Sequence, residues 1–430
     1  MKKFIYFLTF AAFFISCSDD DTKKEVVVTE PPVVETDCVF AGDIQLDTQA
    51  QVDAFAAKKY CSILGQLQIG STTANSDITS LVGLKTITNI NGMLHVVNNP
   101  KLVSLAGLDN ITKTQRIIIH YNDALQNIDN LNVITKNDFA GYDISNNASL
   151  SSLGGLKGTL SIESLQIDRC PLLSSLKGLE NCIKIDDLNI SSCPLIKNLD
   201  GLKSIEELGS ININTTGLES LAGLSKVKNI GGLSLQNNTK LSSLNGLTSL
   251  SMLGSLTFVN NALIVNFDVL KNASISGVIR ITDNSGLKSL QGLEGTKQAV
   301  IYLQNNPALT SLQGLQNLTH TGGISIIDNT ALTSIEQLAS LKIIQASFPS
   351  KSSTYPDGGL VIKNNASLTS LNGLQNVTSF LGELIISTNA SLTDFCAIKY
   401  IVTNGYLYGQ GVYNNANPLT LTDIRQGNCN

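Results

Sequence analysis

The sequence lacks the features that several large classes of protein require. It has no run of basic residues, and its 29 Lys and Arg are outnumbered by 34 Asp and Glu, which gives a net charge of -5. That balance offers no attractive field to nucleic acid or to anionic lipid. The three histidines, His95, His120 and His320, do not have a metal-ligand spacing such as His-x-x-x-His. We therefore expect no metal, no cofactor and no nucleic-acid partner.

Long apolar runs are also missing, apart from one at the very start. Residues 4–15 are apolar or nearly so, which is shorter than the roughly 20 residues that a membrane-spanning helix needs. Because Lys2 and Lys3 precede this run and Ser16 and Cys17 follow it, the segment is typical of a secretion signal. We expect residues 1–16 to be the signal peptide.

The junction after the apolar run indicates a lipid anchor. Residues 14–17, Phe-Ile-Ser-Cys, resemble a lipobox, in which the signal is cut before a cysteine that then carries several acyl chains. The acidic run at residues 19–21 is similar to the export signal of Bacteroidetes lipoproteins. The resemblance implies lipidation at Cys17 and an outward-facing position on the cell outer membrane; an ordinary secretory signal with an incidental cysteine is the alternative. Residues 17–37 then form a flexible tether, because they have no helical or strand periodicity.

A block of the type Ser-Leu-x-Gly-Leu recurs along nearly all of the remaining chain. Its first apolar residue returns at intervals of 22 to 25 residues, with one interval of 36. Such a fixed period predicts a solenoid of stacked coils. The fourteen anchors are Leu81, Leu105, Ile128, Leu153, Leu176, Leu199, Leu221, Leu244, Phe267, Leu290, Leu312, Ile335, Leu371 and Phe395.

A second fixed position lies six residues before each anchor. Apolar residues stand three and five positions ahead of it, as Leu94 and Val96 do, and this alternation predicts a short strand with one face inward. Stacking would place the second position in a buried ladder, where side-chain amides bond backbone groups. It is occupied by Asn75, Asn99, Asn122, Asn147, Asn238, Asn261, Asn284, Asn306, Asn329, Asn365 and Asn389, and otherwise by Cys170, Cys193 and Thr215.

The pattern Leu-x-Ile-x-x-Asn-x-x-Leu-x-Ser-Leu-x-Gly-Leu resembles the leucine-rich repeat. Its 23-residue length resembles the L domains of insulin- and epidermal-growth-factor-type receptors and of their bacterial relatives, over residues 62–398. The resemblance implies a right-handed, mostly β solenoid of about fourteen coils. One coil buries too little apolar surface to offset the entropy of ordering it, so stability must come from neighbouring coils.

The cysteines predict how the ends of the solenoid are covered. Cys38 and Cys61 bracket a plausible capping helix at residues 48–57, and Cys396 and Cys429 bracket an irregular last segment. We expect a disulfide bond in each cap, because an exported chain permits them and open solenoid ends need a cover. The domains are then an N-terminal cap at residues 38–61, the solenoid at 62–395 and a C-terminal cap at 396–430.

Three further cysteines, Cys170, Cys182 and Cys193, have no assigned partner. Cys170 and Cys193 occupy the ladder position in consecutive coils. Two buried thiols and a bridge between the coils are both consistent with that placement.

A catalytic site is not evident on the expected strands. Lyases and hydrolases on β solenoids need carboxylates or metal ligands gathered at one place. Asp143 is the one acid at the middle outward position, while Asp168, Asp283 and Asp328 in neighbouring columns are several repeats apart. We expect a non-catalytic binding or adhesion module for a glycan or a protein. A passive envelope component and a β-helix polysaccharide lyase or hydrolase are the alternatives.

Ligand contacts are predicted at three places. His95, His120 and Tyr121 fall together near the front of the array, and Arg280 and Tyr302 occupy adjacent outward positions further along. The 36-residue interval holds an insert at residues 346–358, which would leave the solenoid as a surface loop. The contacts within this insert would be Phe348 and Tyr355.

Replacing Cys17 with serine tests the anchor. Since the thioether needs the sulfur atom, Cys17→Ser should abolish acyl labelling and move the protein out of the membrane fraction. Ser16→Ala is the control and should keep both properties. A Cys17→Ser protein that is still labelled and membrane-bound would contradict the lipobox assignment.

Overall fold

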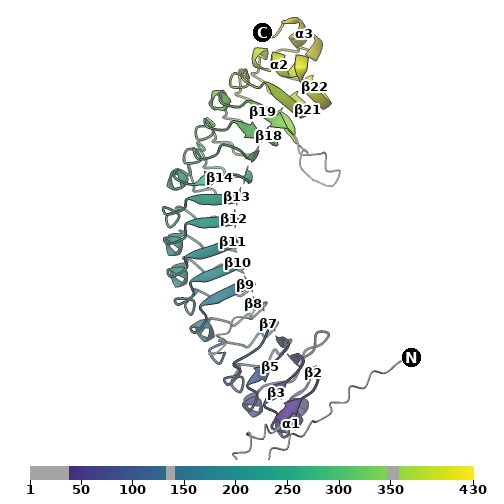
Figure 1. Ribbon diagram of the computed structural model, residues 1–430, viewed down its shortest axis with the longest axis vertical. Helices are drawn as coiled ribbons and strands as arrows, with labels where there is room; N and C mark the ends of the chain where they lie inside the picture. The colour runs from purple at the N-terminus through teal and green to yellow at the C-terminus, as the bar shows by residue number, and fades with distance from the viewer. Residues whose placement is uncertain (1–37, 132–140, 346–357) are drawn as a thin grey trace, which may run out of the picture. The chain divides into compact units, whose positions relative to one another are not determined.

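A computed structural model describes residues 38–131, 141–345 and 358–430, which belong to one unit, Cys38–Asn430. Cys17, the tether, Phe348 and Tyr355 lie outside the described residues. In Figure 1 the strands of this unit lie side by side along one edge of the stack, and the turns lie along the opposite edge. No helix in these ranges is long and apolar enough to cross a membrane.

One strand from each coil pairs in parallel with the strand of the next coil, in an unbroken order from β2 to β22. The inward residues are fully buried, as Leu188 and Ile190 are, whereas Asn189 between them is only half-buried. Alternation along the sequence therefore places every second side chain in a continuous core. These strands are β2 (Ile44–Leu46), β4 (Leu67–Ile69), β6 (Leu94–Val97), β7 (Arg116–His120), β8 (Gly141–Ser145), β9 (Ser161–Asp168), β10 (Lys184–Cys193), β11 (Glu207–Thr216), β12 (Asn229–Gln236), β13 (Met252–Val259), β15 (Val278–Thr282), β16 (Val300–Gln304), β18 (Gly323–Ile327), β20 (Gly359–Lys363), β21 (Ser379–Ser387) and β22 (Tyr406–Tyr413).

Short elements complete the coils. Two-residue and three-residue strands flank the main strands: β1 (Val39–Phe40), β3 (Ser62–Ile63), β5 (Asn89–Ile90), β14 (Ser274–Ile275), β17 (His320–Thr321) and β19 (Ile343–Gln345). Single 3₁₀ turns follow the anchors of seven coils: η2 (Val82–Leu84), η3 (Gly154–Leu156), η4 (Asp200–Leu202), η5 (Ala222–Leu224), η6 (Asp268–Leu270), η7 (Glu336–Leu338) and η8 (Cys396–Ile398). The architecture is the predicted mostly β, leucine-rich-repeat-like solenoid.

The glycine of the repeated block is required by close stacking of the coils. Gly314 has a φ of 116°, and a Cβ atom at this residue would lie 2.0 Å from the carbonyl oxygen of Leu290 in the preceding coil. A side chain there would therefore force the two coils apart, which explains why the sequence block ends in Gly-Leu.

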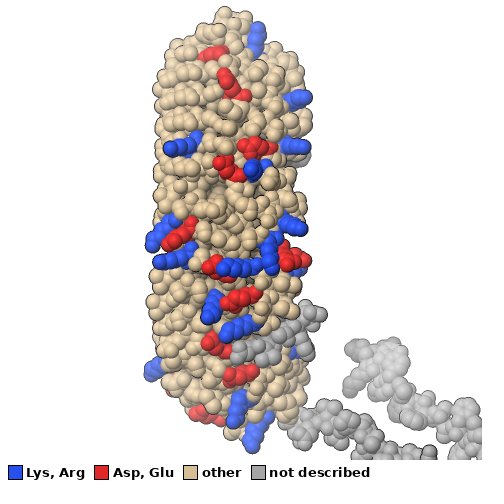
Figure 2. Space-filling model, turned by 90° about the vertical axis from the view of Figure 1, so that its left-hand side faces the viewer, with Lys and Arg blue, Asp and Glu red and all other residues tan. Residues whose placement is uncertain are grey.

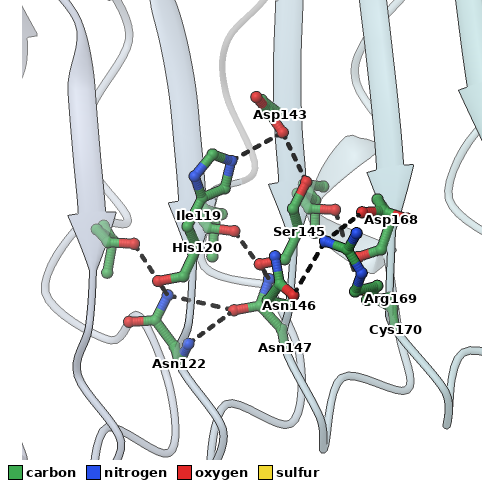
Figure 3. Close-up of polar contacts among 12 residues, drawn as sticks. Ile119, His120, Asn122, Asp143, Ser145, Asn146, Asn147, Asp168, Arg169 and Cys170 are labelled. Atoms are coloured by element: carbon green, nitrogen blue, oxygen red, sulfur yellow. Dashed lines mark hydrogen bonds and ion pairs between the residues drawn. The ribbon is translucent and has the colours of Figure 1, made fainter. Parts of the chain in front are cut away.

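The predicted Asn ladder is present and buried. In Asn306, Nδ2 donates to the carbonyl oxygens of Ile281 and Gln304 at 3.0 and 3.1 Å, so one amide binds the preceding coil and its own. The backbone N–H and Nδ2 of Asn306 also donate to Oδ1 of Asn329 in the next coil, each at 3.1 Å. Figure 3 shows the equivalent bonds from Asn122 to Asn147. Asn306 thus connects three coils.

Two ladder positions differ from the prediction. Asn75 is exposed, and the neighbouring Ser76 is buried and donates to Oδ1 of Asn99 at 2.6 Å. Thr216, not Thr215, bonds Oδ1 of Asn238, at 2.7 Å. Counting back six residues from the anchor was wrong here, because both coils have one residue fewer between the ladder position and the anchor.

The residue before each ladder position from Asn99 onward has a left-handed backbone. Its φ lies between 49° and 61° in fourteen coils, a conformation that Asn and Asp adopt at lower cost than other non-glycine residues. These residues are Asn98, Tyr121, Asn146, Arg169, Ser192, Thr215, Asn237, Asn260, Asp283, Asn305, Asp328, Asn364, Thr388 and Asn414. The bend places them outside the core, next to the buried ladder.

The N-terminal cap contains the predicted disulfide bond, Cys38–Cys61, and the predicted helix, α1 (Gln49–Ala56). Val52 and Phe55 are its buried residues and cover the first coil. Thr48 caps the helix, since its side chain accepts from the N–H of Gln51.

The C-terminal cap is more regular than predicted. The Cys396–Cys429 bond is present, but the segment that it closes holds α2 (Lys399–Asn404), β22 and α3 (Leu421–Gln426). Asn415 continues the ladder, because Oδ1 accepts from the N–H of Asn389 at 3.0 Å and Nδ2 donates to Ile386. One further coil is therefore built from residues that have no repeat block.

The 36-residue interval between Ile335 and Leu371 does not disturb the parallel pairing of the strands. β19, before the insert, pairs with β21 through Ile343 and Ser379, and β20, after it, pairs with the same strand through Gly359 and Glu383. The described residues on both sides of the insert therefore belong to one coil, as expected. Of the insert itself, residues 346–357 lie outside the described ranges.

A matched pair of isosteric substitutions tests the ladder. In Asn238→Asp, a carboxylate oxygen replaces the amide that donates to the carbonyl of Ile213 at 2.9 Å, so a buried charge faces an acceptor. We expect a loss of about 2 to 4 kcal/mol in the free energy of unfolding at pH 7. Asn237→Asp, at an exposed residue, should cost less than about 0.5 kcal/mol. Denaturant unfolding measures both, and equal losses would contradict the ladder.

Candidate functional site

The outward side chains of the stacked strands form one surface, here called the strand face. The parallel register aligns them in columns that run from coil to coil. The middle column reads Gln68, His95, Ile118, Asp143, Gln166, Asn189, Asn212, Ser234, Thr257, Arg280, Tyr302, Ser325, Val361 and Ile385. A ligand bound here would contact several coils at once.

The central part of the strand face, from β8 to β12, carries only small or polar side chains. We call it the polar belt, and its outward residues are Gly141, Asp143, Ser145, Ser164, Gln166, Asp168, Asp187, Asn189, Ser191, Ser210, Asn212, Asn214, Gly232, Ser234 and Gln236. Asn212 Nδ2 donates to Asn189 Oδ1 at 3.1 Å, but Oδ1 of Asn212 is buried without a hydrogen-bond partner. The polar belt therefore offers many uncharged donors and acceptors and no apolar side chain.

At the front edge of the polar belt lies a cluster of ionisable side chains, here called the front group: His95 on β6, Arg116 and His120 on β7, and Asp143 on β8. Nε2 of His120 lies 2.8 Å from Oδ1 of Asp143, and both side chains are mostly buried. Ser145 Oγ donates to the same carboxylate at 2.8 Å. Figure 3 shows His120 and Ser145 converging on Asp143 from neighbouring strands.

The pKa values of the front group reflect burial and mutual charge. Burial by itself raises the pKa of Asp143, but the bonds from His120 and Ser145, with the charges of His120 and Arg116, outweigh it and lower the pKa. Burial, followed by the nearby charge of His120, lowers the pKa of His95. Asp143 is therefore a carboxylate and His95 is neutral near pH 7.

Apart from Nε2 of His120, whose contact with Asp143 is an ion pair that lacks hydrogen-bond geometry, two nitrogen atoms in the front group have no partner among the described residues. Nε2 of His95 and Nε of Arg116 are buried and make no hydrogen bond. No carboxylate of the described chain lies within ion-pair distance of Arg116. Buried polar atoms are rarely unsatisfied, so these two mark a place where a further group would be stabilising.

The other predicted contacts fall in different places. The ring of Tyr121 packs edge-on against His120 with centroids 6.3 Å apart, so Tyr121 borders the front group as expected. The guanidinium of Arg280 lies over the ring of Tyr302 at 5.2 Å, on β15 and β16, well beyond the polar belt. Phe348 and Tyr355 are outside the described residues. The structure thus joins His95, His120 and Tyr121 but separates them from Arg280 and Tyr302.

Sequence analysis missed two groups of residues. Arg116 received no role, although its place two residues before Ile118 on an alternating strand puts it on the same face. Asp143 was noted as a lone acid, while its pairing with His120 depends on the register between β7 and β8. In the C-terminal cap, the exposed tyrosines Tyr400, Tyr406, Tyr408 and Tyr413 were also not singled out.

The described residues offer neither a cluster of metal ligands nor a reactive thiol. No cluster of three or more His, Cys, Asp or Glu side chains could hold a metal ion there. Cys170, Cys182 and Cys193 are unbridged, and burial raises the pKa of their thiols to about 12, 11 and 11. They remain protonated and are not nucleophiles at neutral pH.

The face formed by the turns, opposite the strands, carries few charges. Figure 2 shows Lys and Arg interspersed with Asp and Glu on it, without a large patch of either sign. This face has no electrostatic feature that would attract a strongly charged partner.

Comparison with known proteins extends only to the fold. No protein-family model and no curated protein matches the sequence. A chain of the TLR13–ssRNA13 complex is 18% identical with a TM-score of 0.48, over 89% of this chain and 59% of that chain. A leucine-rich-repeat protein of Leptospira interrogans is 15% identical with a TM-score of 0.39, over 81% of this chain and 91% of that chain. This chain therefore spans about 59% of the length of the TLR13 chain.

The ion pair in the front group predicts a pH-dependent contribution to stability. Because the pKa of Asp143 lies below its ordinary value of 3.8, its contribution is present above pH 4 and is lost as pH falls through the lower, folded-state pKa. Asp143→Asn should cost about 0.5 to 1 kcal/mol at pH 6, and progressively less as the pH falls below 3.8. Asp123→Asn, at an exposed residue, should be neutral at both. Denaturation at several pH values measures this, and a loss for Asp143→Asn that is independent of pH would refute it.

Proposed function

We propose that this chain is a cell-surface lipoprotein whose solenoid is a non-catalytic binding module for a glycan. Residues 14–17 and 19–21 support the anchor and its outward position, on sequence grounds alone. The unit Cys38–Asn430 would then be held outside the cell on a tether of about twenty residues. Such a placement suits capture or adhesion at the surface.

The polar belt is the observation that carries the proposal. Its hydroxyl and amide groups match the hydroxyl groups of sugars, which both donate and accept hydrogen bonds. Protein interfaces depend instead on large aromatic and arginine anchors that fill pockets, and the belt has neither from β8 to β12. A glycan laid across the coils would form many weak bonds rather than a few strong ones.

Catalysis has less support than binding. A glycosidase needs a carboxylic acid with a raised pKa beside a second carboxylate, whereas the pKa of Asp143 is lowered. The other two acids of the polar belt are engaged by neighbours: Asp168 by Ser191 and Arg169, and Asp187 by Ser210. These bonds suit a binding surface.

The test is a binding assay with the full-length chain, purified in mild detergent, on arrays of glycans and proteins. We expect binding to one class of glycan. A triple variant of the polar belt, Gln166→Ala, Asn189→Ala and Asn212→Ala, should weaken that binding at least about tenfold, or about 1.4 kcal/mol. The matched control changes three exposed residues on the turns, Lys177→Ala, Asn245→Ala and Gln313→Ala, and should bind as the unaltered protein does.

Three results would overturn the proposal. Binding to proteins alone would replace the ligand class. Equal glycan binding by the two triple variants would move the site off the polar belt. No binding to either array would favour the passive envelope component.

A further inference from the structure

The front group lies next to the polar belt, but its hydrogen bonding differs from that of the belt. The belt satisfies most of its polar atoms through bonds between side chains, whereas the front group leaves Nε2 of His95 and Nε of Arg116 buried and unbonded. These atoms belong to adjacent strands and to the same face, because His95 pairs with Ile118, two residues after Arg116. Both unsatisfied atoms therefore belong to outward side chains of the strand face, on β6 and β7.

The charges of the front group indicate what kind of ligand group could bind there. Asp143 is already engaged by His120 and Ser145, and no other carboxylate of the described chain reaches Arg116. Arg116 is thus a half-buried cation that forms no ion pair with the described residues, and the charge of His120 influences His95. A ligand carboxylate would supply the negative charge that Arg116 lacks. It can accept two hydrogen bonds from a guanidinium and another from a histidine N–H at the same time.

We propose that His95, Arg116 and His120 bind the carboxylate of a uronic-acid unit in an acidic glycan that continues along the polar belt. The inference rests on the proposed function, since the belt would hold the neutral hydroxyl groups of the same chain. Asp143 acts as a positioning residue, because its bond fixes the ring of His120.

Continuity with the polar belt favours a glycan over an acidic peptide. A peptide carboxylate would need apolar contacts nearby to hold the rest of its chain, and Ile118 is the single aliphatic outward residue on β7, between Arg116 and His120. The coils that follow supply only hydroxyl, amide, carboxylate and glycine groups. The carboxylate of a sugar acid would bind the front group, and the hydroxyl groups of the same glycan would bind the polar belt.

The surroundings of His95 predict how binding depends on pH. The charged or titratable groups near it are Arg116 and His120 on β7 and Asp143 on β8, while β4 on its other side presents Gln68. A bound carboxylate favours the protonated form of His95, whose pKa is lowered in the free protein, so complex formation takes up protons. Affinity should therefore be higher at pH 6 than at pH 8.

The experiment uses the full-length chain and fragments of polygalacturonate, alginate and hyaluronan, each beside its own carboxyl methyl ester. Titration calorimetry at pH 6 and pH 8 measures affinity. We expect at least one acid fragment to bind, with its ester at least tenfold weaker. Arg116→Gln should weaken binding of the acid tenfold or more, and His95→Gln should remove most of the pH dependence. Lys271→Gln, at an exposed residue of the turns, is the control that removes one positive charge away from the strand face, and it should change neither.

The outcomes separate this inference from the proposed function. Equal affinity for acid and ester, or an unchanged Arg116→Gln protein, would overturn the inference. If the polar-belt variant still lost binding to an uncharged glycan, the proposed function would stand without it. Binding of none of the acid fragments, or capture of an acidic peptide in their place, would also overturn it. Thermal unfolding of Arg116→Gln and His95→Gln shows whether a loss comes from misfolding, and a folded variant of either residue is sufficient for the test.

Discussion

The buried amide ladder is the interaction on which the rest of the structure depends. At the end of each strand the chain bends while still inside the core, and the bend leaves backbone groups that water cannot reach. An asparagine side chain satisfies them because it can donate and accept at once, as Asn306 does between Asn284 and Asn329. Since the same atoms bond the coils on both sides, the ladder also fixes the parallel register that aligns the strand face.

The ladder changes its chemistry in the middle of the array, where Cys170, Cys193 and Thr216 replace asparagine in consecutive coils. Thiols and hydroxyls form fewer and weaker bonds than amides. In this region the strands are the longest of the stack: β10 and β11 have ten residues each and pair as far as Cys193 and Thr216. Additional backbone pairing there offsets what the side chains do not supply.

The sequence was sufficient for the architecture because the repeat carries it. One period specifies the inward residues, the ladder and the turn glycine, and the same assignment recurs in each copy of the repeat. The exceptions are local: Ser76 and Thr216 were misplaced by one residue where a coil is shorter, and the last coil was missed because Asn415 follows no repeat block. A repeat pattern cannot predict the positions of residues that depart from it.

The candidate site was less predictable for a related reason. His95, His120 and Tyr121 stand out as rare residue types, and the structure does place them together. The pairing of His120 with Asp143 crosses between two columns and two coils, so it depends on side-chain direction as well as on register. Whether Nε of Arg116 finds a hydrogen-bond partner depends on the side chains around it in the fold. A sequence pattern does not show those surroundings.

The register of the strand face has a consequence for how recognition can change over time. Along the middle column a ligand meets Gln166, Asn189 and Asn212 in succession, residues that are 23 positions apart in the chain. Insertion or loss of one whole repeat would shift every later contact by one coil while leaving the core and the ladder intact. A gene encoding such an array can therefore acquire a new order of contacts by unequal recombination between its repeats, without passing through an unfolded protein.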